Sequence, residues 1–502
     1  METTYFTFLH EIVAQAGQNI TGIFQGIVDV NADFRSYHQV FLAYSSGFGV
    51  GGWIFYIAMI LIVIGIVGCL FTALIYLIRR TTKHIKDGMN INDLQDENER
   101  LHLELYRLQR LELGSHYMNT PTPAGLPQPQ QEKDESLLEK RFPRLSQIDE
   151  KYPSGMLQIN IPEEEAGIDL AEICARFQNF ACNSCGLFYS ITTVRSFISS
   201  LGASKLLILE GISGTGKTSL PYAMGRFFQN DAHICAVQPS WRDKSELIGY
   251  YNDFTKRFFE TEFLCALYES NYNDATNFIV LDEVNLARIE YYFADILSLM
   301  ETPNKNIASL QVIPNPEPSD PKLLQNGSIK IPQNLYFIGT ANNDESTFSI
   351  TDKVYDRAMV LEFEAKEKPF QAPISKPLPL PFSYLETLFE NAKKQRPLSA
   401  ANKANFDALL ERVFEMFGVN LGNRVMKQIE SFVPCYVECG GTETEALDFL
   451  FRTKIMKKVV TKMQTTSQDA IETLDKEIVN LFGDDSFIIS RSYLQKIRKG
   501  IR

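Results

Sequence analysis

Residues 205–228 read KLLILEGISGTGKTSLPYAMGRFF, and this stretch decides the fold. Its first part, Leu206–Leu209, is a short unbroken apolar run, which is typical of a strand buried on both faces of a parallel sheet. Gly211–Thr218 then match G-x-x-x-x-G-K-[ST], and a helix is expected directly afterwards. Backbone N–H groups in such a loop curl around a phosphate at the helix N-terminus. The stretch predicts an α/β domain built around a phosphate-binding loop.

Each position of this loop has an expected task. Lys217 should reach the β- and γ-phosphates of a nucleotide, and the Thr218 hydroxyl should coordinate magnesium. The sequence predicts that the nucleotide is bound by Gly211, Ile212, Ser213, Gly214, Thr215, Gly216, Lys217, Thr218 and Ser219.

Two further apolar runs end in polar side chains. The run NFIVL is followed by Asp282 and Glu283, and the run LYFIGTA is followed by Asn342, with Asn343 as an alternative. Ligands in α/β sheets bind at the carboxyl ends of the strands. We therefore expect Asp282 to hold magnesium, mostly through water, and Glu283 to orient and polarise the attacking water. The Asn342 amide should hydrogen-bond the γ-phosphate or that water.

An arginine is the fourth catalytic candidate. Arg357 precedes the apolar strand that starts at Met359, where the γ-phosphate of a neighbouring subunit could receive it. A lone arginine is more often a surface ion pair, and this alternative stays open.

These elements, in this order, resemble the AAA+ ATPases, and most closely the McrB-like group. The resemblance covers about residues 165–465 and is carried by GISGTGKTSLP, QPSWRDKSELIGYYNDF, LDEVNLARIEYYFADILSLME and GTANNDESTFSITDKVYDRAMVLEF. It implies a P-loop NTPase core, with a parallel sheet flanked by helices, and an α-helical lid. It also implies an ATPase that uses ATP and magnesium at the subunit interfaces of a hexameric ring.

The resemblance assigns roles to three residues. Asn342 would be sensor 1, Arg357 the finger that acts in trans, and Arg424 the sensor 2 arginine that contacts nucleotide, in its own subunit or in the neighbour. The expected divisions are a helical lead-in over residues 137–202, the large AAA+ subdomain over 203–370, and the lid and C-terminal region over 380–502.

The choice between adenine and guanine rests on the residues that follow the third strand. McrB itself resembles a GTPase, and its guanine preference is associated with an Asn-x-x-Asp segment after sensor 1. Here residues 342–345 read NNDE, so the acid is displaced from the register in which a carboxylate would accept two guanine N–H groups. ATP is the expected nucleotide, with GTP as the alternative.

Three other features are read from the chain. A strand is followed, where AAA+ rings carry a pore loop, by Trp241, Arg242 and Lys244. These side chains could grip a nucleic-acid backbone or a peptide. Alternatively, the tryptophan packs in the core and the two cations are solvated. The runs SLQVI and SIKIP predict a hairpin before the third strand. Cys182, Cys185, Cys435 and Cys439 have partial zinc-site spacing, but reduced thiols are the expected state.

The N-terminal quarter predicts a membrane anchor. Residues 53–78 form an uncharged apolar run long enough to span a bilayer. Four cations follow the run within eight residues, whereas residues 1–50 carry one arginine, so the positive-inside rule places the ATPase domain in the cytoplasm and residues 1–50 outside it. A coiled-coil stalk is expected over 88–114 and an extended proline-rich linker over 115–136.

Composition limits the function classes. The 502 residues carry a formal charge of −12 and eight scattered cysteines, which argues against a nucleic-acid-coated surface and against an extracellular disulfide framework. The first function predicted is a membrane-tethered motor that remodels or translocates nucleic acid with a separately encoded nuclease, in defence against foreign DNA. The alternatives are a MoxR-like chaperone acting on proteins at the membrane and a nucleotide-gated scaffold without turnover.

Overall fold

The protein is represented by a computed structural model. It describes a few isolated positions between residues 39 and 57 and four long stretches, which are residues 140–301, 308–342, 347–462 and 468–500. The chain divides into two compact units, Met1–Gln128 and Pro129–Arg502, and the fold described below is that of the second unit.

The N-terminal predictions fall mostly outside these residues. The stalk at 88–114, the linker at 115–136 and nearly all of the membrane segment at 53–78 are not described. None of the helices within the described stretches combines the length and the apolar character that crossing a membrane requires.

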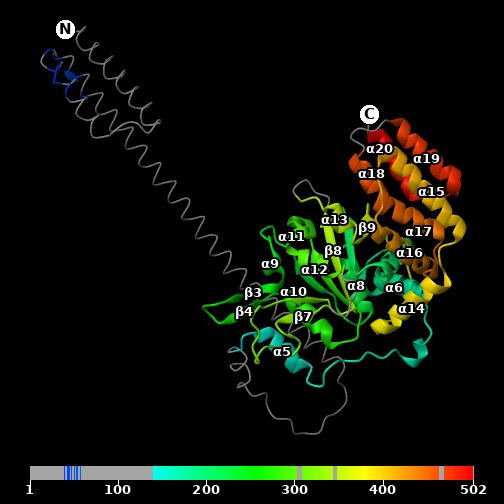
Figure 1. Cartoon of the computed structure of the whole chain (residues 1–502), viewed down its shortest axis with the longest axis horizontal. Helices are drawn as coiled ribbons and strands as arrows, with labels where there is room; N and C mark the ends of the chain where they lie inside the picture. The colour runs from blue at the N-terminus through cyan, green and yellow to red at the C-terminus, as the bar shows by residue number, and fades with distance from the viewer. Residues whose placement is uncertain are drawn as a thin grey trace. The chain divides into compact units, whose positions relative to one another are not determined.

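Five parallel strands form the central sheet, in the order β2-β5-β8-β1-β9 (Figure 1). Their bounds are β1 Leu206–Gly211, β2 His233–Ala236, β5 Asn277–Asp282, β8 Leu335–Asn342 and β9 Met359–Phe363. β1 pairs with β8 from Leu206 opposite Phe337 to Gly211 opposite Asn342. Because the strands are parallel, the ends of β1, β5 and β8 that carry polar residues meet at one edge of the sheet.

The strands are buried on both faces because alternate side chains point in opposite directions. Leu207 and Leu209 belong to the core on one face, and Leu206 and Ile208 belong to the core on the other. Helices cover both faces, so the predicted α/β class with a flanked parallel sheet is confirmed (Figure 1). The helices before the C-terminal part are α5 Pro143–Lys151, α6 Leu170–Cys185, α7 Ile191–Ala203, α8 Ser219–Phe227, α9 Lys244–Ile248, α10 Glu262–Glu269, α11 Ile289–Tyr292, α12 Ala294–Leu299 and α13 Asp352–Tyr355.

Two antiparallel hairpins extend the body. β3 Gly249–Asn252 pairs with β4 Arg257–Glu260, and β6 Ser309–Gln311 pairs with β7 Ser328–Lys330. The second hairpin is the one predicted from SLQVI and SIKIP, and it is confirmed.

The start of the second unit is attached to the first hairpin. The Phe142 ring stacks on Phe258 of β4 with ring centroids 4.9 Å apart. Glu260, at the end of β4, accepts hydrogen bonds from the backbone N–H groups of Arg144 and Leu145, both at 2.8 Å. These amides belong to the first turn of α5, so a carboxylate from another element caps the helix.

The C-terminal helices form a helical unit, here called the lid. They are α14 Phe382–Gln395, α15 Ala400–Phe417, α16 Asn423–Glu438, α17 Glu443–Leu450, a π-helix Phe451–Met456, α18 Lys457–Lys462, α19 Gln468–Phe482 and α20 Ile488–Gly500. The lid is tied to the sheet by partly buried ion pairs: Arg452 pairs with Glu362 of β9 at 2.5 Å, and Lys457 pairs with Glu210 of β1. Glu210 immediately precedes the phosphate-binding loop.

Candidate nucleotide site and arginine pair

The loop after β1 has backbone conformations that suit glycine. Gly214 and Gly216 have φ values of +78° and +93°, and Gly211 has a φ of +143°. A Cβ atom on Gly211 would lie 2.1 Å from the carbonyl oxygen of Phe363, so β9 leaves no room for a side chain there. The tight turn brings the loop amides to the N-terminus of α8, as an anion site requires.

Lys217 lies across this loop. Its side chain is 6% exposed, and its Nζ donates hydrogen bonds to the carbonyl oxygens of Gly211 and Ile212, at 3.1 and 2.7 Å. A buried ammonium is costly unless it is hydrogen-bonded, and here two carbonyl groups of the loop supply these bonds. The cation is therefore held at the mouth of the phosphate-binding loop.

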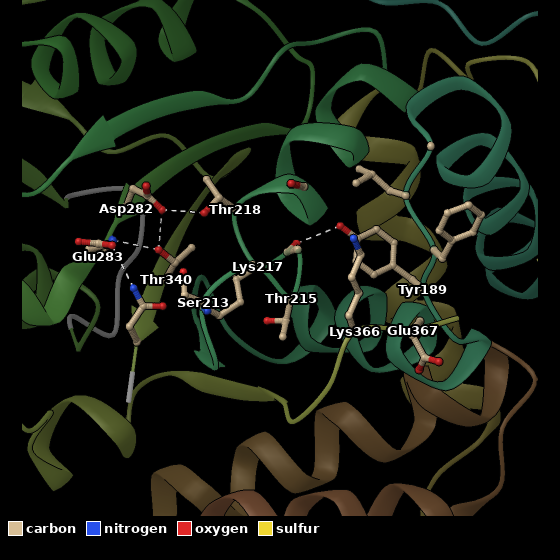
Figure 2. Close-up of a pocket in the computed structure, with 17 residues that line it drawn as sticks. Tyr189, Ser213, Thr215, Lys217, Thr218, Asp282, Glu283, Thr340, Lys366 and Glu367 are labelled. Carbon is tan, nitrogen blue, oxygen red and sulfur yellow. Dashed lines mark hydrogen bonds between the residues drawn. The ribbon is translucent and has the colours of Figure 1, made fainter. Parts of the chain in front are cut away.

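One carboxylate oxygen, at the end of β5, contacts both β8 and the N-terminus of α8. Asp282 Oδ1 accepts a hydrogen bond from the Thr218 hydroxyl and another from the Thr340 hydroxyl, both at 2.7 Å (Figure 2). A hydroxyl and a carboxylate oxygen in contact, beside a phosphate-binding loop, are the hard oxygen ligands that magnesium uses. Thr218 and Asp282 thus fit the magnesium site that the sequence predicts.

Glu283 is held by the same threonine and by Asn342. Its backbone is left-handed, with φ 56° and ψ 52°, which is uncommon for a residue with a side chain. Its N–H donates to the Thr340 hydroxyl at 2.9 Å, and its Oε1 accepts from Asn342 Nδ2 at 3.0 Å. Both the backbone and the carboxylate of Glu283 are therefore fixed from β8.

A second layer fixes Asn342. Asn285 Nδ2 donates to the Asn342 carbonyl oxygen at 2.7 Å and to the Thr347 hydroxyl at 3.0 Å. The Thr347 hydroxyl donates to the same Asn342 carbonyl at 3.2 Å. The strand end that carries the Asn342 amide is thereby anchored on the turn after β5.

Lys217, Thr218, Asp282, Glu283 and Asn342 line one cavity of about 410 Å³. Thr218, Asp282 and Thr340 lie at one end of it, and Tyr189, Lys366 and Glu367 lie at the other (Figure 2). Because the first end holds the metal-type ligands, a nucleotide in this cavity would place its phosphates there and its nucleoside at the Tyr189 end. The cavity is lined by residues 186–189, 213–219, Asp282, Glu283, Thr340, Asn342, Lys366 and Glu367.

Several of these residues were not predicted. Thr340 could have been found, because it lies two positions before Asn342 on the same strand and therefore on the same face. Tyr189 donates a 2.9 Å hydrogen bond from its hydroxyl to the Gly216 carbonyl oxygen, and burial raises its pKa. Lys366 and Glu367 come from the segment that leads to the lid. No sequence pattern marks these last three, since only the fold brings them to the loop.

Arg357 and Arg424 lie elsewhere. Both line a second cavity of about 280 Å³, together with Ser204 and Lys205, which precede β1. The phosphate-binding loop begins at the opposite end of β1, and a six-residue strand is roughly 20 Å long. An arginine side chain does not reach that far, so neither guanidinium can contact a phosphate bound in the loop of its own subunit.

The predicted pore loop and the four cysteines lie apart from both cavities. The Trp241 ring packs edge-on against Tyr292 with ring centroids 5.2 Å apart, and Lys244 pairs with Asp295 at 3.1 Å, so the aromatic candidate in this loop joins the core. Cys439 contacts Cys174 and the Ser199 hydroxyl, whereas Cys182 Sγ donates to the Phe370 carbonyl oxygen. Within the described stretches, no group of three or more histidine, cysteine or acidic side chains could hold a metal ion.

Comparisons with known proteins give distant similarities. The chain matches no protein-family model and no curated protein. Among solved structures it is similar to a "putative ATPase from Cytophaga hutchinsonii", with 13% identity, a TM-score of 0.35, and coverage of 66% of this chain and 96% of that one. It is also similar to a full-length MCM homolog from Methanopyrus kandleri, with 10% identity, a TM-score of 0.30, and coverage of 69% and 64%.

Proposed function

We propose that this protein is an ATPase of the AAA+ type that binds ATP with magnesium in the 410 Å³ cavity. One observation carries the proposal. Residues from the loop after β1 and from the ends of β5 and β8 line the same cavity, and they are Lys217, Thr218, Asp282, Glu283 and Asn342. The set supplies a cation, metal ligands, a proton acceptor and an amide donor, which are the groups that phosphoryl transfer to water requires.

The residues have distinct tasks in this reaction. Lys217 compensates charge on the transferred phosphoryl group, and Glu283 accepts a proton from the attacking water. Asn342 keeps the Glu283 carboxylate aimed through its 3.0 Å hydrogen bond. Bound magnesium, held by Thr218 and Asp282, would neutralise charge on the phosphate oxygens.

The position of Arg357 and Arg424 supports assembly into a ring. Neither arginine reaches the phosphate-binding loop of its own subunit, yet both are presented at one cavity at the opposite edge of the sheet. We propose that they contact the γ-phosphate of the neighbouring subunit, and that turnover therefore depends on assembly, in a hexamer of the kind that the sequence resemblance implies.

The sequence supports a proposal for the cellular location of the protein and for the molecule on which it acts. The apolar run at 53–78 and the cations after it favour a single-pass protein of the cell membrane with a cytoplasmic ATPase domain. The McrB resemblance favours a ring that remodels or translocates DNA with a separately encoded nuclease, in defence against foreign DNA.

The β3–β4 hairpin favours a second candidate, the remodelling of a protein at the membrane. Tyr250, Phe254 and Phe259 are 53%, 99% and 60% exposed. Between Tyr250 and Phe259, Asp253 and Lys256 pair at 3.9 Å, and Arg257 adds one positive charge. The exposed rings at this tip suit the apolar side chains of an unfolded polypeptide.

The test is ATP turnover by the full chain in lipid nanodiscs, with and without duplex DNA. Lys217→Ala and Glu283→Gln should each abolish turnover, and turnover that persists in both would refute the ATPase proposal. Stimulation by DNA supports the motor. Indifference to DNA, together with a protein that copurifies with Glu283→Gln in ATP but not in ADP, supports the chaperone. A scaffold would show little turnover for either variant to remove.

A further inference from the structure

One carboxylate oxygen lies between the two arginines of the second cavity. Oε1 of Glu301 forms an ion pair with Arg424 Nη2 at 3.0 Å and another with Arg357 Nη2. The three residues come from separate parts of the chain: Glu301 follows α12, Arg357 lies between α13 and β9, and Arg424 is in the first turn of the lid helix α16.

The backbone of Arg357 is fixed independently of Glu301. Its carbonyl oxygen accepts hydrogen bonds from the Ser204 hydroxyl at 2.8 Å and from Gln428 Nε2 at 3.0 Å. Gln428 lies four residues after Arg424, and therefore on the same face of α16. The lid helix thus holds the main chain of one arginine and supplies the other.

The two guanidinium groups repel each other. The Arg357 side chain is 11% exposed, and the Arg424 side chain is 43% exposed. Burial and the nearby Arg424 charge lower the pKa of Arg357, so the pairing of these cations is unfavourable without an anion. The Glu301 carboxylate is that anion. The buried Nε of Arg357 has no hydrogen-bond partner among the described residues.

We propose that Glu301 is a positioning residue that joins Arg357 and Arg424 into one anion-binding unit for a phosphate oxygen of the neighbouring subunit's nucleotide. The inference rests on the proposed function, because it concerns the arginines that act across the subunit interface. With one carboxylate and two guanidinium groups the unit keeps a net positive charge, which attracts a polyphosphate, while the shared oxygen sets the separation of the two cations. Without Glu301 the cations separate and act singly.

The experiment compares Glu301→Gln, Glu301→Asp, Arg424→Ala and the double variant Glu301→Gln with Arg424→Ala. Each is the full chain in nanodiscs, at a protein concentration where wild-type turnover per subunit no longer rises. We expect Glu301→Gln to lower kcat at least about tenfold while the KM for ATP changes less than about twofold, because the subunit's own cavity is intact. Glu301→Asp should recover part of the loss. Glu386→Gln is the matched control, since Glu386 lines the same cavity without an ion pair among the described residues.

Non-additivity is the decisive readout. If Glu301 acts through the arginines, Arg424→Ala should cost less than about twofold in the Glu301→Gln background, although it costs about tenfold or more alone. Three outcomes would overturn the inference. The losses of the two single variants could multiply in the double variant, the kcat of Glu301→Gln could equal or exceed that of the wild type, or Glu386→Gln could lose as much activity as Glu301→Gln. If turnover persists in Lys217→Ala, the ATPase proposal itself is refuted, and this outcome is distinct from a failure of the Glu301 inference.

Discussion

Asn342 donates a hydrogen bond from Nδ2 to Oε1 of Glu283 at 3.0 Å, across the ends of two adjacent strands. The amide engages one oxygen of the carboxylate that we propose as the proton acceptor. The left-handed backbone of Glu283 and its N–H bond to Thr340 hold the residue at the position where this contact forms. The orientation of the carboxylate is thus determined mainly by β8.

Replacing Asn342 by alanine should lower kcat by about 10²-fold or more, because a fixed donor that aligns the reacting groups is lost. The dissociation constant for ATP should change little, since Lys217 and the loop amides remain. Steady-state kinetics and equilibrium binding of a fluorescent ATP analogue check this. Asn405→Ala is the control, because its Nδ2 donates to the Leu481 carbonyl oxygen inside the lid. Equal losses in the two variants would contradict the prediction.

Thr340→Val should raise the magnesium concentration needed for half-maximal turnover. The Thr340 hydroxyl donates to Asp282 and accepts from the Glu283 N–H, and valine has nearly the same shape without either capacity. An unpaired N–H and a less constrained carboxylate cost about 1–3 kcal/mol in total. A magnesium titration of turnover measures the shift. An unchanged magnesium requirement would show that Thr340 does not position Asp282.

Gly211→Ala should destabilise the protein and prevent ATP binding, since the new Cβ would lie 2.1 Å from the Phe363 carbonyl oxygen. Gly155→Ala separates this clash from backbone strain, because Gly155 has a φ of +87° and nothing within 4 Å of its Cβ position. Strain alone costs about 1–2 kcal/mol. Thermal unfolding should show a larger loss for Gly211→Ala, and equal losses would exclude the clash as the cause.

Lys454 makes stability depend on pH. Its Nζ donates to the carbonyl oxygens of Tyr355, at 2.8 Å, and Ala358. Burial lowers its pKa from 10.5 to about 7, with Asp356 favouring the charged form and Lys457 and Lys458 opposing it. Between pH 7 and 10.5 the unfolded chain therefore binds more protons than the folded chain at this site, and the free energy of unfolding rises with pH in that window.

The rise should approach about 1.4 kcal/mol per pH unit within that window. Lys454→Met should remove it, because the side chain no longer titrates. Denaturant unfolding at several values between pH 7 and 9.5 measures the slope. Lys403→Met, at a side chain that is 55% exposed, should leave the slope as in the wild type. A slope that persists in Lys454→Met would assign it to other groups.

Phe254→Ala should affect the response to the client, whereas Trp241→Ala should affect the stability of the fold. Phe254 is 99% exposed, so its loss should leave the melting temperature within about 2 °C of the wild type. If the hairpin contacts the client, the variant should lose client-stimulated turnover and keep basal turnover. Trp241 packs on Tyr292, so Trp241→Ala should mainly lower the melting temperature. Client stimulation that survives in Phe254→Ala would remove the hairpin from the contact.

The sequence predicted the strands β1, β5 and β8 because their apolar runs are short, uninterrupted and followed by polar residues, whereas it did not predict β3 and β4. That pattern also predicted Asp282, Glu283 and Asn342 as site residues, since parallel strands bring their carboxyl ends together. The same pattern could also have identified Thr340 as a site residue.

The remaining site residues depend on contacts between distant segments. Tyr189 meets Gly216 only when α6, α7 and α8 pack together, and Glu301 meets Arg424 only when the lid folds onto α12. The position of Arg424 depends on how the lid packs against the sheet. Spacing along the chain does not show near which end of the strands the start of α16 lies.

The attachment of α5 to the β3–β4 hairpin has a mechanical consequence. The main chain at residue 141 accepts a 2.8 Å hydrogen bond from the Phe258 N–H, and Glu260 holds the next amides. Tension applied to the chain ahead of residue 140 would reach β4 within a few residues, before it reached the phosphate-binding loop. The hairpin with the exposed Phe254 would therefore be among the first elements strained by such a tension.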